Sequence, residues 1–280
     1  MADNIWNSIL LVFKIIFATN PLFQLLTLLL WAIALVIIAQ NPMPRKTYWY
    51  YSKNIASIFI ALMAIVLILR QIHYPFLLVL LPMNFVLALV FTNAGFYLSA
   101  CNKSYNLPIL LSLGRQHSKC RNFQFWKMFF HVIIWSTFVC VFTYILFKIT
   151  HPKMAHYLQD QTESFDMDNA IPTTAILFFI LIAFYEEIIF RLFTQNFLMR
   201  LLRHISFGKI LAIILTSIFF AYGHTGILEN DWVKLLQTFV IGLVLSRSML
   251  KYGMEASLTI HIILNLFAIF AADYLVAPTP

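Results

Sequence analysis

Eight apolar stretches, each close to the length of a membrane-spanning helix, dominate this sequence. They are Pro21–Gln40, Asn54–Arg70, Pro75–Ala100, Lys127–Ile149, Thr174–Leu198, Gly208–His224, Trp232–Arg247 and Ala256–Val276. A helix crosses the hydrocarbon core of a bilayer with roughly 20 apolar residues. The chain is 61% hydrophobic and only 11% charged, whereas soluble domains are about 25% charged. The sequence therefore predicts an all-α fold, a polytopic transmembrane helical bundle with about eight spans.

A shorter apolar segment, Ile5–Ala18, precedes these stretches and carries Lys14 near its middle. Two interpretations stay open, because a segment of this kind is either a ninth span or a helix that lies in the membrane interface.

The formal net charge of +8 is concentrated after alternate spans. The basic residues in these places are Arg45, Lys46, Lys53, Lys103, Arg115, Lys119, Arg121, Arg200, Arg203, Lys209, Arg247 and Lys251. The intervening connections are acidic or nearly neutral, as with Glu229 and Asp231. By the positive-inside rule the basic connections are cytoplasmic and the C-terminus lies outside. The charge is thus expected to set topology and to contact membrane lipids, and no nucleic-acid partner is predicted.

Three charges interrupt the fifth stretch in the sequence AFYEEIIFR, which contains Glu186, Glu187 and Arg191. A charged side chain near the bilayer centre costs roughly 2.5 to 3.5 kcal/mol on insertion scales, so it normally faces a partner or a water-filled cavity. Glu187 and Arg191 are four residues apart and are predicted to pair on one helix face. Glu186 then needs a cation, a metal or a proton from another helix. The alternative is a purely structural ion-pair network.

Polar partners for Glu186 occur in two other spans. His224 ends the sixth stretch, and His261 and Asn265 share one face of the eighth at a spacing of four residues. One glutamate, two histidines and one asparagine can form a metal site, or can activate a water and hold an oxyanion. In upright helices His224 would lie near the outer membrane face and His261 near the inner one, so their convergence requires tilted helices or shifted boundaries.

The segments EEIIFR (Glu186–Arg191), FAYGH (Phe220–His224) and HIILN (His261–Asn265) resemble the EExxxR, FxxxH and HxxxN motifs of the CPBP family of intramembrane proteases. That family contains the eukaryotic CAAX prenyl proteases of the Rce type and bacterial proteins often labelled Abi. The resemblance covers roughly the last third of the chain. It implies a catalytic transmembrane core over residues 174–280, with residues 1–173 as variable supporting helices.

The resemblance also implies roles for the residues. Glu186 would be the base that activates water, and Glu187 would be positioned by Arg191. His224 would hold the water or a metal together with Glu186, and His261 and Asn265 would complete the site or stabilise the oxyanion.

The family is usually described as metalloproteases, which makes Glu186, His224 and His261 the candidate ligands of a divalent metal, with zinc as the candidate ion. The chain has no HExxH motif, in which two histidines one turn apart face a zinc ion. A metal-free mechanism driven by Glu186 therefore stays open.

The implied function is an intramembrane endopeptidase acting on a membrane-embedded or lipidated peptide or protein. Compact size, short loops and the lack of a recognisable targeting signal favour the bacterial inner (plasma) membrane. Two alternatives remain. One is a catalytically silent scaffold or bacteriocin self-immunity protein of the same fold. The other is a proton-coupled transporter, whose relays also use carboxylates and histidines within spans, although the paired halves typical of transporters are not evident.

Overall fold

The computed structural model describes residues 21–41, 45–69, 75–102, 118–153 and 172–275. Across these ranges the chain forms helices and no strand, which confirms the predicted all-α bundle. The helices are α2 (Pro21–Gln40), α3 (Arg45–Leu69), α4 (Pro75–Asn102), α5 (Ser118–Thr150), α7 (Pro172–Glu186), the π-helix η3 (Glu187–Thr194), α8 (Gln195–Leu201), α9 (Gly208–Tyr222), α10 (Asp231–Tyr252) and α11 (Met254–Leu275). The segment Ile5–Ala18 lies outside the described residues.

Within the described residues all eight apolar stretches fall on helices, except that Gly223 and His224 follow the end of α9, and several helices extend beyond the stretches. Helix α3 begins at Arg45 rather than Asn54, α5 begins at Ser118 rather than Lys127, and α10 continues to Tyr252. Lys53 is therefore part of a helix and not of a loop. The physical reason is that long basic and aromatic side chains at the end of a span reach the interface while their backbone stays helical.

Five helices among the described residues are long and apolar enough to cross a membrane, and α2 and α9 contain shorter apolar segments. Large apolar side chains on their outer faces are exposed, including Ile58, Ile134 and Phe270. Such surfaces suit contact with lipid and not with water. The chain is an integral membrane protein.

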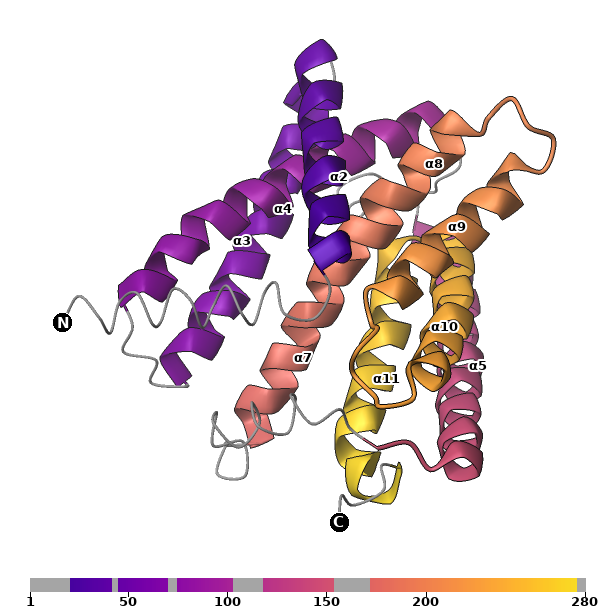
Figure 1. Ribbon diagram of the computed structural model, residues 1–280. Coiled ribbons are helices and arrows are strands. Elements are labelled where there is room, and N and C mark those ends of the chain that lie inside the picture. The colour runs from indigo at the N-terminus through magenta and orange to yellow at the C-terminus, as the bar shows by residue number, and fades with distance from the viewer. Residues whose placement is uncertain (1–20, 42–44, 70–74, 103–117, 154–171, 276–280) are drawn as a thin grey trace.

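A long ribbon formed by α7, η3 and α8 runs through the middle of the molecule (Figure 1). Helices α2, α3 and α4 lie on one side of it, and α5, α9, α10 and α11 lie on the other (Figure 1). Contacts of η3 with α4, α9, α10 and α11 bury all eight of its residues. The motif EEIIFR thus occupies the centre of the bundle.

Two glycines shape the packing around this centre, one by a close helix approach and one by a turn. A Cβ atom on Gly95 in α4 would lie 2.7 Å from the carbonyl oxygen of Leu192 in η3, so only glycine allows the two helices to pack this closely. Gly253 has a φ of 89° and forms the turn between α10 and α11, a conformation that other residues rarely adopt. The two helices that follow His224 therefore pack side by side.

Candidate active site in the membrane core

The two adjacent glutamates lie where the helix changes its geometry. Glu186 is the last residue of α7, and Glu187 is the first residue of the π-helix η3. The wider turn is visible in hydrogen bonds that span five residues. The backbone N–H of Gln195 donates to the carbonyl of Phe190, and the Thr194 hydroxyl donates to the carbonyl of Ile189 at 2.8 Å. π-Helical turns are rare and occur frequently at functional sites.

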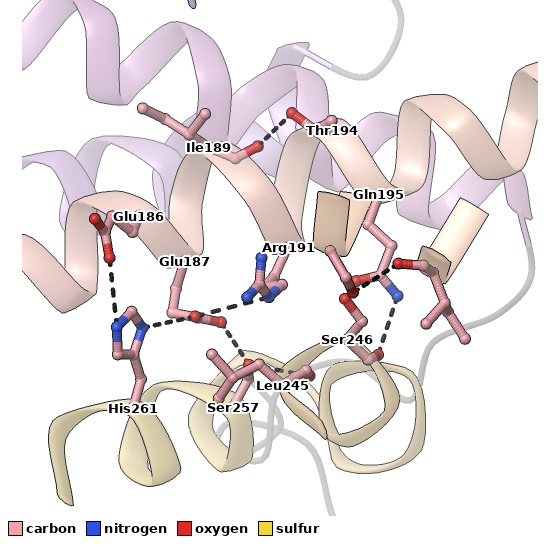
Figure 2. Close-up of polar contacts among 12 residues, drawn as sticks. Glu186, Glu187, Ile189, Arg191, Thr194, Gln195, Leu245, Ser246, Ser257 and His261 are labelled. Atoms are coloured by element: carbon pink, nitrogen blue, oxygen red, sulfur yellow. Dashed lines mark hydrogen bonds and ion pairs between the residues drawn. The ribbon is translucent and has the colours of Figure 1, made fainter. Parts of the chain in front are cut away.

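Glu187 is fully buried and bound by two residues of α11. Its Oε1 lies 3.0 Å from His261 Nδ1, and its Oε2 lies 2.5 Å from the Ser257 hydroxyl oxygen (Figure 2). Ser257 Oγ is also 3.1 Å from the Leu245 carbonyl of α10. Glu187 thus connects the motif helix to α11.

Glu186 lies between the two motif histidines. Its Oε2 is 3.3 Å from His261 Nε2, and its Oε1 is 3.5 Å from His224 Nε2. The side chain of Glu186 is 19% exposed and that of His224 is 17% exposed, while Glu187 is completely buried. Glu186 is therefore the carboxylate of the pair that a water or substrate can reach.

The other ring nitrogens of the histidines indicate their tautomers. His224 Nδ1 is 2.7 Å from the carbonyl oxygen of Phe220, which only accepts, so Nδ1 carries the proton. His261 Nδ1 likewise donates to the Glu187 carboxylate. In the neutral rings both Nε2 atoms then present lone pairs towards Glu186. Two lone pairs facing a carboxylate need a proton, a water or a cation between them.

Arg191 packs against an aromatic ring as well as against Glu187. Its Nε is 3.9 Å from Glu187 Oε1, and its guanidinium carbon is 4.3 Å from the centre of the Phe220 ring. Among the described residues, none offers a hydrogen-bond acceptor to its three guanidinium nitrogens. The predicted ion pair with Glu187 is present, but it is long, and the cation–π contact with Phe220 supplements it.

Asn265 is directed towards α7 rather than towards the glutamates. Its side-chain nitrogen donates to the carbonyl of Phe179 at 3.2 Å. It lies one helical turn beyond His261 on α11, as its spacing predicts. The structure thus brings together Glu186, Glu187, Arg191, His224 and His261, and places Asn265 at the edge of this group.

His224 and His261 both lie beside the Glu186 carboxylate, and the helix before His224, α9, is short. Helix α9 has 15 residues and spans about 23 Å at 1.5 Å per residue, which is less than the roughly 30 Å of hydrocarbon core. The chain turns after Tyr222, and His224 lies beside Glu186 within the bundle. The convergence that required tilted helices or shifted boundaries is therefore present in the structure.

Two residues of this cluster were not identified from the sequence. Phe220 contacts the rings of His224 and His261 at centroid distances of 4.6 and 5.7 Å, in addition to Arg191. Ser257 binds Glu187. Both had a signal in the sequence, since Phe220 is the first residue of the FxxxH motif and Ser257 lies four residues, about one helical turn, before His261.

The donor types suit a metal, but the described part of the chain contains no group of three or more His, Cys, Asp or Glu side chains arranged to hold one. Two histidines and one glutamate are a ligand set of catalytic zinc sites. A metal-binding histidine usually donates its second nitrogen to a carbonyl or carboxylate, and His224 and His261 both do so.

Comparison with known proteins relates part of the chain to a described family. Residues 168–267 match the family model described as type II CAAX prenyl endopeptidase Rce1-like. This match confirms the family resemblance that the three motifs indicate, and it covers all of them. No curated protein matched the chain, and no solved structure matched it.

Proposed function

We propose, from this family match and the geometry around Glu186, that the protein is an intramembrane endopeptidase in which Glu186 is the general base. The observation that carries the proposal is the position of Glu186, partly exposed and within 3.5 Å of the free Nε2 atoms of two histidines. A water between these groups would lose its proton to Glu186 and attack the peptide carbonyl carbon. The same carboxylic acid would then protonate the leaving amine.

The neighbouring residues have positioning roles in this proposal. Glu187 and Ser257 fix the orientation of His261, so that its Nε2 atom points to Glu186. The Phe220 carbonyl fixes His224 in the same way. Asn265 is one turn from His261 and would donate to the oxyanion only after exchanging the Phe179 carbonyl for substrate.

The metal is a separate part of the proposal. Glu186, His224 and His261 would hold a divalent ion, with zinc as the first candidate. Such an ion would lower the pKa of a bound water to about 7 and make it a nucleophile at neutral pH. If one oxygen of Glu186 ligates the ion, its second carboxylate oxygen would take the proton from the water.

We also propose a membrane-embedded or lipidated peptide as the substrate, because Glu186 and His261 lie on helices in the membrane core. The short connections between helices leave little room for a soluble recognition domain, which supports recognition within or at the bilayer. The bacterial inner membrane is the proposed location, and fractionation of cells expressing the tagged protein would test it.

The deciding experiment compares Glu186→Gln with wild type on a lipidated or membrane-embedded reporter peptide in liposomes. The substitution keeps size and removes the charge, so the variant should fold with an unchanged melting temperature and lose roughly 10² to 10⁴ in rate. Glu229→Gln, which removes an exposed glutamate from the loop before α10, is the matched control and should stay active. Equal cleavage by Glu186→Gln and wild type would refute the base assignment. Absence of cleavage by wild type on all reporters, with Glu186→Gln still supporting a cellular phenotype, would favour the silent scaffold.

Metal dependence is measured on the same purified protein. If the two histidines and Glu186 bind zinc, about one equivalent should copurify, and chelation should abolish cleavage that added zinc restores. The His224→Ala variant should lose the bound zinc. Full activity of metal-free protein would assign the reaction to Glu186 without a metal.

A further inference from the structure

A cavity of about 360 Å³ lies between the beginning of α5 and the end of α10. Its lining residues include Trp126, Lys127, Phe130 and His131 from α5, and Lys251 and Tyr252 from α10. None of these residues belongs to the three family motifs. The cavity is thus a second candidate binding site.

His131, which lines the cavity, is held in place by contacts with α10. His131 is 8% exposed, and its Nε2 is 3.0 Å from the hydroxyl oxygen of Ser248 on α10. The His131 ring also packs against Tyr252 at a centroid distance of 4.7 Å. These contacts join α5 to α10 beside the cavity.

Two lysines from different helices give the cavity a positive charge. Lys127 and Lys251 are both exposed and both line it. Lys251 lies 5.2 Å from the centre of the Tyr252 ring. Trp and Tyr are typical of the membrane interface, and the basic end of α10 is predicted to be cytoplasmic. The cavity therefore lies at the depth of lipid headgroups.

An apolar stripe leads from the lysines along α5. Trp126, Phe130 and Ile134 follow one another at intervals of four residues, and they are 54%, 58% and 63% exposed. All three line the cavity. A site with cations at one end and an exposed apolar stripe at the other matches a molecule with an anionic head and a hydrocarbon tail.

We propose that this cavity binds an anionic phospholipid of the cytoplasmic leaflet. Lys127 and Lys251 contact its headgroup, and an acyl chain lies along Trp126, Phe130 and Ile134. Basic pockets between transmembrane helices on the cytoplasmic side are known to bind such headgroups. The inference does not depend on the proposed hydrolysis.

The test is native mass spectrometry of the full-length protein with phosphatidylglycerol and, separately, with phosphatidylcholine. Wild type should bind phosphatidylglycerol more tightly, and the double variant Lys127→Gln/Lys251→Gln should bind it about thirtyfold more weakly, given the usual contribution of each basic residue near an anionic surface. Lys209→Gln removes an exposed lysine from the predicted cytoplasmic end of α9 and should bind as wild type does. Glu186→Gln should also bind as wild type does, which separates this result from the test of catalysis.

Three outcomes would overturn the proposal. The first is equal binding of phosphatidylglycerol by the double variant and wild type. The second is an equal loss in Lys209→Gln, which would indicate general surface charge. The third is displacement of the lipid by millimolar inorganic phosphate, which would assign the site to a free anion. A melting curve of the double variant beside wild type separates a loss of lipid binding from a loss of folding. Trp126→Ala, which shortens the apolar stripe, should weaken binding of both lipids and provides an independent check.

Discussion

Glu186 and Glu187 are neighbours in the chain but have different surroundings. Glu187 is fully buried and bound by Ser257 and His261, whereas Glu186 is 19% exposed and lies beside two histidine Nε2 atoms that hold no proton in the neutral ring. This difference supports the proposal above, in which Glu187 has a positioning role and Glu186 takes part in the chemistry. His261 touches both, so a change in either glutamate affects the other.

At the same scale, Arg191 tests how the buried charge of Glu187 is balanced. Arg191→Ala should lower stability by roughly 3 to 5 kcal/mol, because removal of one partner leaves a buried charge without compensation. The measurement is a thermal melt of purified protein in detergent. Arg203→Ala removes an exposed arginine after α8 and is the control that should not change the melt.

A further variant separates the two contacts of Arg191. Phe220→Leu keeps an apolar side chain but removes the ring beneath the guanidinium, so it should cost less, up to about 2 kcal/mol from the cation–π contact plus any loss of packing. An Arg191→Ala protein as stable as wild type would mean that Ser257 and His261 alone balance Glu187.

At the scale of helices, the sequence predicts the spans well and the details around the site less well. Apolar stretches near 20 residues indicate helices irrespective of their neighbours, so Pro21–Gln40 coincides with α2. Spacing of four residues correctly indicates that His261 and Asn265 lie one turn apart on α11, but it does not say which helix each side chain contacts. The contact of Asn265 with the Phe179 carbonyl could not be predicted, because the register between α7 and α11 is set only in the folded bundle.

Close helix packing gives a prediction at this scale. Gly95→Ala should destabilise the protein by roughly 1 to 3 kcal/mol, because the added Cβ would lie 2.7 Å from the backbone oxygen of Leu192 and force α4 and η3 apart. At an unconstrained helix position the same change is stabilising, so the sign of the shift is the test. Ala100→Val, at an exposed position of α4, is the control. A raised melting temperature for Gly95→Ala would contradict the close approach.

For the whole molecule, the arrangement of charged ends agrees with the alternation seen in the sequence. Lys251 lines the cavity at the beginning of α5, and the amide of Glu229 donates to the carbonyl of Lys153 just past the other end of α5, at 3.0 Å. Lys251, predicted to be cytoplasmic, and Glu229, predicted to be outside, therefore lie towards opposite ends of α5.

This arrangement predicts the labelling of single cysteines introduced into a variant whose three native cysteines are serine. A membrane-impermeant maleimide should label cysteine at Lys209 or Lys251 only from the cytoplasmic side, and cysteine at Glu229 only from the outer side. Inverted and right-side-out vesicles provide the two conditions. Labelling of all three positions from one side would contradict the eight-span topology.

The wide turn of η3 has a consequence for how relatives of this chain can diverge. One extra residue in a turn shifts the phase of a helix by about 100°, so the residues of α7 and of α8 that face the core follow two separate patterns. Deletion of one residue between Glu187 and Thr194 would restore an ordinary α-helix. One end of the segment would then rotate, so that either the two glutamates or Gln195 would lose its present partners. The present partner of Gln195 is the Ser246 carbonyl, to which its side chain donates. Homologues that lack the π-helix should therefore show a one-residue gap here, together with altered partners at one end of the segment. An insertion or deletion in this segment of a homologue would thus indicate whether the core-facing residues of α7 or those of α8 have kept their partners.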